Sequence, residues 1–416
     1  MPHQRILYPA TQIVTAAAPD PEARRVLVIA PTPFFGDRGC HVRILEEVRG
    51  LQARGADVLV ATYATGNDVA GVRTARAPNV PGLRAPALGP SYGRPFLDTL
   101  LLGTTLRAAR RFRPDIVHAH LHEGIAVGLI AARLVGSPLV ADLQGSLQSE
   151  LVDHRFLRNG GLRSALVGRV ERWLVRQPAA LLASSNMGAR LLADQDVDPA
   201  RIVSLPDGVD LTRFRPMPPD PAQVDRLGLR DKRVIVFLGV LTAYQGVDTL
   251  IAAASRVVES VPNVHFLIMG YPNEEHYRGV VSRRGLDRHV TFPGRIPYDD
   301  AAQWLNLGTV AVSAKTSLTE SNGKLLNYMA CGLPVVATDT PVNRELLGEA
   351  GIYAAVDDPT ALAARLSELL RAPARARAVG ATLRRRVEQE FSWPFLTERL
   401  LRVYERLLTD TTAAAA

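Results

Sequence analysis

The sequence predicts an α/β protein with two doubly wound, parallel-sheet domains in series. Short runs of Val, Ile, Leu and Ala alternate with longer segments whose apolar residues recur at helical spacing. Such an alternation is typical of parallel sheets covered by helices. One proline-rich stretch without periodicity, residues 205–221, interrupts the series. We therefore expect one domain at 25–205, a linker at 206–232 and a second domain at 233–392.

The first domain begins after a segment, residues 1–24, that lacks the continuous apolar core of a signal peptide and that we expect to be a flexible tail. An apolar run at 26–30 precedes a loop, a helix that stops at Gly55, and a second run at 58–61. Strand, helix and strand in this order form a βαβ unit, so the strands should be parallel. Further strands are expected at 115–120, 138–141, 180–183 and 201–203.

The second domain repeats this pattern from the apolar run at 234–238, which turns at Gly239 into an amphipathic helix. Its further strands are expected at 264–269, 290–292, 310–312 and 334–337. Ligands of such sheets bind beyond the carboxyl ends of the strands. The loops after residues 30, 120, 238, 292 and 312 should therefore converge on a cleft between the domains. The last segment, 393–416, should be a helix and a tail.

Composition bounds the class of protein. A hydrophobic content of 47% and a charged content of 22% are those of a soluble globular protein. The net charge of +8 suits an anionic ligand, a membrane surface or nucleic acid, but compositional bias is the simpler explanation, and we expect no nucleic acid partner. Cys40 and Cys331 are too few for a disulfide framework. No run is long and apolar enough to span a membrane, so we expect a cytoplasmic protein.

The stretch 319–337 carries the strongest functional signal. It contains Glu320, a turn at Gly323, Lys324, a helix start and a strand after Gly332. A helix N-terminus offers N–H groups to phosphate, and a nearby carboxylate accepts hydrogen bonds from sugar hydroxyls. This order predicts a site for a phosphorylated sugar. Taken alone, a capped helix with an exposed lysine is the commoner explanation.

Several motifs together resemble glycosyltransferase family four. They are Pro206 to Asp210 before Phe214-Arg215-Pro216, Gly239 with Gly246-Val247-Asp248, residues 290–297, residues 329–337, and Phe391-Ser392-Trp393 with Tyr404. The resemblance implies the GT-B fold, in which two Rossmann-like domains face each other and the last helix, about 394–408, crosses back to the first domain. It also implies retaining transfer of a sugar from a UDP- or GDP-type donor to a hydroxyl acceptor, with no cofactor or bound metal.

The resemblance assigns roles to particular residues of the second domain. Lys324 and the backbone at the helix start would hold the diphosphate, Glu320 the transferred sugar, and Asn327 the ribose. Arg295 and Ile296 would meet the base. The remaining binding positions implied here are Gly239, Gln245, Asn322, Gly323, Leu325 and Leu326.

This chain departs from the family pattern in two places. The family has two glutamates eight positions apart, where this chain has Thr319 and Asn327. After the strand at 234–238 the family supplies an arginine and a lysine, where this chain has Val240 and Gln245. A charge-assisted hydrogen bond is worth about 1.5–3 kcal/mol, so an active enzyme should replace these cations.

We expect Lys324 and Arg38 to replace the missing cations. The alternatives are a donor that is not a conventional nucleoside diphosphate sugar, or a catalytically silent protein that binds a glycan or a partner enzyme.

In the first domain, the loop Gly36-Asp37-Arg38-Gly39 precedes a helix, so its backbone should approach a phosphate across the cleft; a plain turn is an equally good explanation. Gln144 should orient the acceptor or a sugar hydroxyl. We expect His118 and His120 to point to opposite faces of their strand, with His120 nearer the reacting centre. No carboxylate or cysteine pattern completes a metal site with them.

Residues 155–176 include six arginines and one acid, with Leu162, Leu166, Val170, Trp173 and Leu174 at helical spacing. Such a helix would suit peripheral contact with an anionic inner membrane face and a lipid-linked acceptor. The alternative, which we prefer from sequence, is a helix that packs its apolar stripe inward and leaves its arginines in water.

Overall fold

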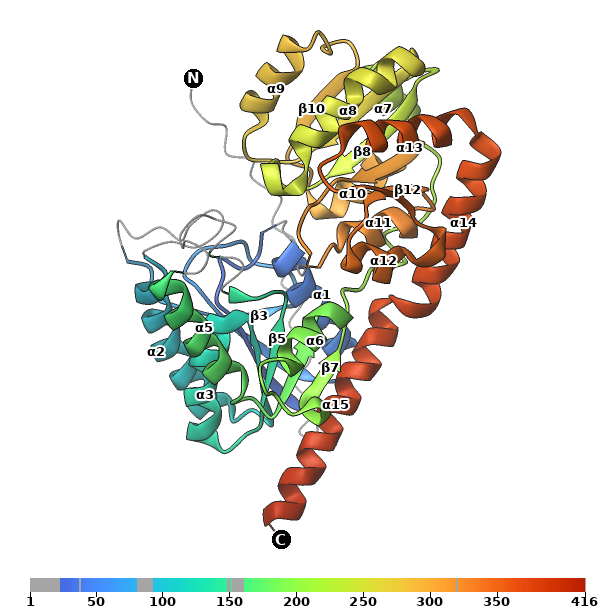
Figure 1. The fold of residues 1–416 in the computed structure, drawn as a ribbon. Coiled ribbons are helices and arrows are strands. Elements are labelled where there is room, and N and C mark those ends of the chain that lie inside the picture. Colours follow the sequence, from blue (N-terminus) through green and yellow to red (C-terminus); the bar gives the residue numbers. More distant parts are fainter. Residues whose placement is uncertain are drawn as a thin grey trace.

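The computed structural model describes residues 23–36, 39–80, 93–147, 151, 161–318 and 321–415, which form two α/β domains (Figure 1). The first domain contains a seven-stranded parallel sheet of order β3-β2-β1-β4-β5-β6-β7. Its strands are β1 (Arg25–Ala30), β2 (Asp57–Thr62), β3 (Arg73–Arg76), β4 (Ile116–His120), β5 (Leu139–Leu143), β6 (Ala180–Ala183) and β7 (Ile202–Ser204). Its helices are α1 (Gly39–Ala53), α2 (Arg94–Phe112), α3 (Leu121–Val135), α5 (Leu162–Val175) and α6 (Asn186–Ala193).

The second domain contains a six-stranded parallel sheet of order β10-β9-β8-β11-β12-β13. Its strands are β8 (Arg233–Leu238), β9 (Val264–Met269), β10 (Val290–Gly294), β11 (Val310–Ser313), β12 (Val335–Thr338) and β13 (Ile352–Ala354). Its helices are α7 (Pro221–Arg226), α8 (Val247–Ser260), α9 (Glu274–Arg283), α10 (Ala301–Leu305), α11 (Lys324–Ala330), α12 (Pro341–Leu347), α13 (Pro359–Arg371) and α14 (Pro373–Glu390). The expected α/β architecture with two parallel sheets is confirmed.

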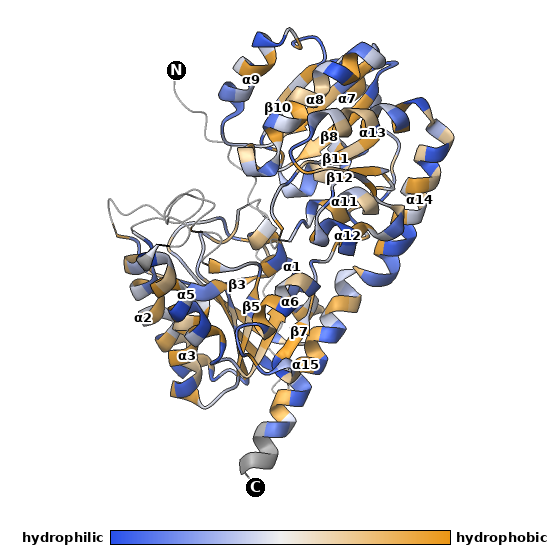
Figure 2. Ribbon diagram, viewed as in Figure 1, coloured by the Kyte–Doolittle hydropathy of each residue, from blue (hydrophilic) through white to orange (hydrophobic). Residues whose placement is uncertain are grey.

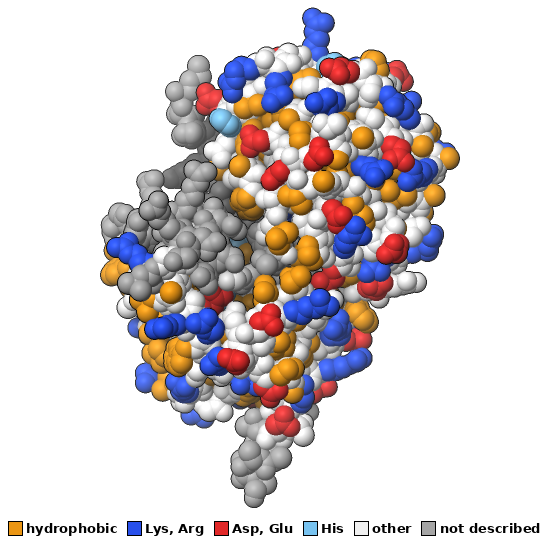
Figure 3. Space-filling view, viewed as in Figure 1, with side chains coloured by type: hydrophobic (Ala, Val, Ile, Leu, Met, Phe, Trp, Pro, Cys, Tyr) orange, Lys and Arg blue, Asp and Glu red, His pale blue; other side chains and the backbone are white. Residues whose placement is uncertain are grey.

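Both sheets are buried on their two faces, as the continuous apolar runs predict. Alternate residues of β1 enter different cores: Leu27 and Ile29 pack with α2 and α3, whereas Val26 and Val28 pack with α1 and the last helix. Figure 2 shows hydrophobic strands at the centre of each domain. On the face seen in Figure 3, basic and acidic side chains are interspersed over the second domain, which is typical of a surface in contact with water.

Two strands were missed from the sequence, β3 and β13, and both lie at sheet edges. The segment of β3 reads Arg-Thr-Ala-Arg and has no apolar run that would identify it. An edge strand is paired on one side only, so it needs less apolar surface than a central strand.

The last helix, α15 (Trp393–Ala415), crosses from the second domain back to the first, as expected from the resemblance (Figure 1). Leu396, Leu400, Val403 and Leu407 pack with β1, β2 and α1. The Tyr404 hydroxyl and His118 Nδ1 are 2.6 Å apart in a buried hydrogen bond. The helix thereby ties the second domain to the far face of the first sheet.

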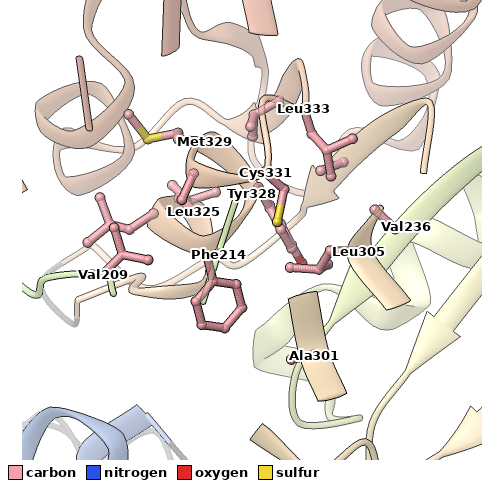
Figure 4. Close-up of a cluster of buried hydrophobic side chains, with 14 of the residues drawn as sticks. Val209, Phe214, Val236, Ala301, Leu305, Leu325, Tyr328, Met329, Cys331 and Leu333 are labelled. Carbon is pink, nitrogen blue, oxygen red and sulfur yellow. The ribbon is translucent and has the colours of Figure 1, made fainter. Parts of the chain in front are cut away.

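The linker packs on the second domain. Val209 and Phe214 are fully buried and belong to the same core as Leu325 and Tyr328 of α11 (Figure 4). The linker is thus held against the helix that carries the strongest functional motif.

Replacement of Leu400 by alanine tests the contribution of α15. Leu400 is 1% exposed, so Leu400→Ala should lower the free energy of unfolding by about 2–5 kcal/mol, because it leaves a cavity between α15 and the first domain. Phe395→Ala, on the same helix but 42% exposed, should have a smaller effect. Urea unfolding followed by circular dichroism measures both. Equal effects would contradict this account of α15.

Candidate active site

A lysine lies at the carboxyl end of β8, where the two expected cations are missing. Lys324 is the first residue of α11, and its Nζ donates a hydrogen bond to Gln245 Oε1 at 2.6 Å. The same ammonium lies 4.5 Å from the centre of the Phe237 ring. A Cβ on Gly239 would lie only 3.0 Å from Lys324 Nζ. Glycine at 239 therefore keeps room for a cation that comes from another element of the fold.

The start of α11 is a tight turn with Gly323 at its N-cap. The backbone N–H groups of Leu325 and Leu326 donate to the carbonyls of Asn322 and Gly323, at 2.9 and 3.0 Å. In this structure those two N–H groups bond within the turn rather than toward a ligand, because the first turn closes with i to i−3 bonds. The side chains of Leu325 and Leu326 are fully buried in the core.

Asn322 holds the loop before α11 in place. Its side-chain amide donates to Ser313 Oγ at 3.1 Å and to Asn343 Oδ1 at 2.8 Å, and only 3% of the residue is exposed. Asn322 thus links β11, α12 and the loop. This arrangement explains why an asparagine stands at a position assigned above to ligand binding: it fixes the geometry of the turn.

A second lysine of this region was missed from the sequence. Lys315 lies two residues after the end of β11 and is 4% exposed, and its Nζ donates to the Ser321 carbonyl at 2.6 Å. Its position could have been recognised from the sequence, because a lysine just after a strand lies at the carboxyl edge of a parallel sheet, where ligands bind. Glu320, Thr319 and Arg38 lie outside the described residues, so their assignments stay predictions.

The residues assigned to the nucleoside lie around the ends of β9, β10 and α11. Asn327 is half-buried in the first turn of α11, and Ile296 is 7% exposed. Arg295 is exposed, and its guanidinium lies 5.4 Å from the centre of the Tyr271 ring. A Cβ at Gly270 would lie 1.7 Å from the Gly239 carbonyl oxygen, so only glycine allows the ends of β8 and β9 to approach.

On the first domain, a buried arginine forms the centre of an ion-pair network. Arg43 of α1 is 1% exposed. Its Nε lies 3.1 Å from both carboxylate oxygens of Asp142 and from Glu47 Oε1, and its Nη2 lies 2.6 Å from Asp142 Oδ2. Burial opposes the charged form, yet Asp142, Glu47 and Asp207 raise the pKa of Arg43 well above its ordinary value. The guanidinium is therefore charged, and it was not identified from sequence.

Asp207 of the linker carries this network to the second domain. Arg43 Nη1 donates to Asp207 Oδ1 at 3.0 Å, and the Ser321 hydroxyl donates to Asp207 Oδ2. Ser321 precedes the turn that begins α11. A continuous chain of polar contacts thus joins α1 of the first domain to the start of α11.

The expectation that His118 and His120 point to opposite faces is wrong. Residues two apart on a strand share a face, and the two rings are stacked with centres 4.6 Å apart. Both rings are buried, and burial lowers the pKa of both histidines, that of His120 to about 3, with Arg43 contributing. His120 Nε2 lies 3.6 Å from Glu47 Oε2, so the ring lies inside the network rather than on an open surface. The lowered pKa keeps this ring neutral at neutral pH.

The sequence pattern showed no carboxylate partner for these histidines, but the fold places two carboxyl groups beside them. Ligand atoms of Glu47, His118, His120 and Asp142 lie within 4.8 Å of one another, a donor set that a metal ion accepts. Arg43, however, already contacts both carboxylates and supplies positive charge there. Partners separated by so many residues cannot be recognised from spacing.

The remaining candidates of the first domain lie at the ends of strands or helices. Gln144 follows β5 directly and is half-buried, and its buried side-chain nitrogen has no hydrogen-bond partner among the residues that the structure describes. Gly39 is the exposed first residue of α1. Gly36 lies beside His41, whose ring would be 3.2 Å from a Cβ at that position.

Comparison with known proteins identifies the family. Residues 38–208 match the glycosyl transferase 4-like domain, and residues 232–372 match glycosyl transferases group 1. The chain is 30% identical over 422 residues to the D-inositol 3-phosphate glycosyltransferase of Mycolicibacterium paratuberculosis, covering 94% of this chain and 92% of that protein. The chain belongs to glycosyltransferase family four. It is a glycosyltransferase, of a family that uses nucleotide sugars.

Solved structures agree on the GT-B fold. Sucrose-phosphate synthase from Thermosynechococcus elongatus superimposes with a TM-score of 0.77 at 19% identity, covering 93% of this chain and 100% of that chain. HepE of Anabaena, in complex with UDP and glucose, gives a TM-score of 0.75 at 16% identity and covers 92% of this chain and 100% of that chain.

Removal of the central guanidinium tests the network. Arg43→Met leaves the buried carboxylate of Asp142 without its cation, so it should lower the free energy of unfolding by about 3–5 kcal/mol at neutral pH. Arg25→Met is the matched control, because the pair between Arg25 and Asp115 is partly exposed and should be worth about 0.2–1 kcal/mol. Denaturant unfolding compares the two, and similar losses would refute a special role for Arg43.

The pH dependence of stability tests the protonation of Glu47. Burial, with Asp142 next, raises the pKa of Glu47 well above its ordinary value of 4.5. The stabilisation from this proton is complete below pH 4.5 and is lost as the pH rises through the folded-state pKa. Glu47→Gln stays neutral, so its stability relative to wild type should increase with pH. Glu398→Gln, on exposed α15 surface, should show no such trend in unfolding curves recorded between acidic and alkaline pH.

Proposed function

We propose that this glycosyltransferase moves a sugar from a nucleoside diphosphate sugar to a hydroxyl acceptor, with retention at the anomeric carbon and without a bound metal. The observation that carries the proposal is the position of Lys324. Its ammonium reaches Gln245 and the space above Gly239, the region from which the family's usual arginine and lysine are missing. A cation there is suited to the charge that develops on a departing diphosphate.

The chemistry follows from the groups at hand. In a retaining transfer the acceptor attacks the face that the phosphate leaves, and the phosphate oxygen takes the acceptor proton, so no strong base is required. Lys324 and Lys315 supply positive charge at the carboxyl edge of the second sheet. Gln144 would orient the acceptor or a sugar hydroxyl, and Glu320 would hold the transferred sugar. His120 is neutral and buried, so in this proposal it positions its neighbours.

The comparisons suggest which ligands to test first. HepE was crystallised with UDP and glucose, so UDP and UDP-glucose lead the donor panel, followed by GDP and its sugars. Relatives of this chain are named D-inositol 3-phosphate glycosyltransferases, so inositol phosphate is the first acceptor to test. WaaG, whose TM-score is 0.71, is involved in lipopolysaccharide biosynthesis, so lipid-linked acceptors form the second group.

A second candidate is a catalytically silent protein that binds a glycan or a partner enzyme. Val240, Gln245 and Asn327, which carry no charge at positions where the family has ionised residues, favour it. Turnover of any sugar donor that is lost in a folded Glu320→Ala variant would eliminate this candidate.

Calorimetry against the nucleotide panel tests the proposal. Binding of one nucleoside diphosphate, and turnover of the matching sugar nucleotide in the presence of a chelator, is the expected result. Proton NMR of the product should show the anomeric configuration of the donor. No binding of any nucleotide would overturn the proposal.

The role of Lys324 has its own test. Lys324→Met removes a charge-assisted contact to the diphosphate worth about 1.5–3 kcal/mol, so affinity for the nucleotide should fall by roughly 10- to 150-fold. The matched control is Lys232→Met, an exposed lysine at the opposite end of β8. Calorimetry should show unchanged affinity in the control. Equal affinity of wild type and Lys324→Met would mean that the diphosphate is held elsewhere.

A further inference from the structure

Helix α5 turns its apolar stripe outward. Leu166, Val170 and Trp173 follow one another at helical spacing and are 62%, 52% and 56% exposed. The residues of α5 that face the protein include Ser164, Gly168 and Glu171 as well as the apolar Leu174 and Val175. The expectation that the apolar stripe packs inward is therefore correct for Leu174 and wrong for Leu166, Val170 and Trp173.

Helix α3 extends this apolar surface. It packs against α5 and exposes 48% of Ile130 and 41% of Leu134. Among the described residues, nine large hydrophobic side chains are exposed, and six of them lie on α2, α3 and α5. Figure 3 shows hydrophobic and basic side chains next to each other where these helices lie in Figure 1. We name the outward surface of Ile130, Leu134, Leu166, Val170 and Trp173 the α3–α5 face. Concentrated exposure of this kind marks an interaction surface.

The charged side chains that α5 exposes are positive. Arg163, Arg169 and Arg172 are exposed on α5 and form no ion pair with a described residue. The acidic residue of the helix, Glu171, is 3% exposed and points into the protein. Its Oε1 accepts a hydrogen bond from the backbone N–H of Leu147 at 3.1 Å and lies 3.3 Å from His122 Nε2. The outward surface of α5 thus combines arginines with large apolar groups and has no carboxylate.

A cavity of about 430 Å³ lies between α2, α3 and α5 and shares Ile130 with the α3–α5 face. Its apolar lining includes Leu102, Val127, Leu147 and Leu174. His122 and Leu147 follow the carboxyl ends of β4 and β5, the edge of the sheet where a ligand is expected. The cavity therefore connects an apolar outer surface to the edge where we place the acceptor.

We propose that the α3–α5 face binds the surface of a membrane that contains anionic lipids. Arginines at the edge of an apolar stripe contact lipid phosphates while the stripe enters the interfacial layer, and tryptophan favours that layer. Because the charges that α5 exposes are all positive, an anionic lipid surface is favoured as the partner. A second copy of this face is disfavoured, because pairing two copies would bring like charges together. Among the described residues no helix is long and apolar enough to span a membrane. The contact that we propose is peripheral, with the helices lying on the lipid surface.

This contact would bring a membrane-borne hydroxyl acceptor to the edge of the first sheet. That link to catalysis rests on the proposed function, whereas lipid binding does not.

The test uses the full chain and vesicles of phosphatidylcholine with or without phosphatidylglycerol, whose anionic headgroups set a negative surface potential. Wild type should sediment with the anionic vesicles and not with neutral ones, and added salt should weaken binding. The emission of Trp173 should shift to shorter wavelength on binding. Trp393 is buried in the core with α15, and Trp304 packs on the core of the second domain, so neither should report on lipid.

Two double variants separate the contributions. Leu166→Ser with Val170→Ser removes apolar contacts and keeps Trp173 as a reporter, and Arg169→Glu with Arg172→Glu reverses two charges. Each should weaken vesicle binding at least about tenfold. The charge variant removes two basic residues, each of which contributes about fivefold near an anionic surface. The Leu166→Ser with Val170→Ser variant removes apolar area that would enter the interfacial layer. The matched controls are Val356→Ser with Phe395→Ser, also exposed, and Arg377→Glu with Arg385→Glu on α14; they should bind as wild type does.

Three results would overturn the proposal: no binding of wild type to anionic vesicles, equal binding to neutral ones, or equal losses in the α3–α5 variants and their controls. Light scattering provides a further check, since a dimer that Leu166→Ser with Val170→Ser dissociates would make the face a contact between copies. Circular dichroism establishes that each variant is folded. Nucleotide affinity is measured separately, without lipid. Loss of vesicle binding with normal nucleotide affinity would contradict only the membrane proposal, whereas absence of nucleotide binding would contradict only the proposed function.

Discussion

The burial of Arg43 is the constraint on which the relation between the two domains depends. A guanidinium removed from water must be surrounded by opposite charge, because an unpaired buried ion is very costly. Here α1, β5 and the linker each bring a carboxylate, those of Glu47, Asp142 and Asp207. Asp207 also accepts from Ser321 beside the start of α11. The network that keeps Arg43 satisfied therefore also sets the first domain against the donor side of the second.

The donor side shows how one charge can be supplied from a different element. The loop after β8 carries Val240 and Gln245 and has no cation of its own. Lys324 reaches the same space from α11, and Gln245 accepts a hydrogen bond from it. A positive potential depends on where an ammonium lies and not on which element carries it. The lysine at position 324 and the uncharged residues at 240 and 245 therefore belong to one arrangement, in which α11 supplies the positive charge that the loop after β8 lacks.

The edge of the first sheet combines a polar group with an apolar surround. The side-chain nitrogen of Gln144, just after β5, is buried and has no hydrogen-bond partner among the described residues, and the cavity between α2, α3 and α5 adds apolar groups beside this edge. If the acceptor binds here as proposed, an amphiphilic acceptor would contact both kinds of surface, whereas a small polar acceptor would contact only the polar edge.

By itself, the sequence determined the two parallel sheets, most of their strands and the motif around Lys324, because apolar periodicity and local turn residues depend on neighbours in the chain. It did not reveal edge strand β3, which has no apolar run, or Lys315. Only the tertiary structure brought Arg43 to Asp142 and Asp207, and Glu47 to His118 and His120, since these partners lie far apart in sequence. The same holds for α5: periodicity showed an apolar stripe, but packing decided that Leu174 and the polar Glu171 are buried, whereas Leu166, Val170 and Trp173 are exposed.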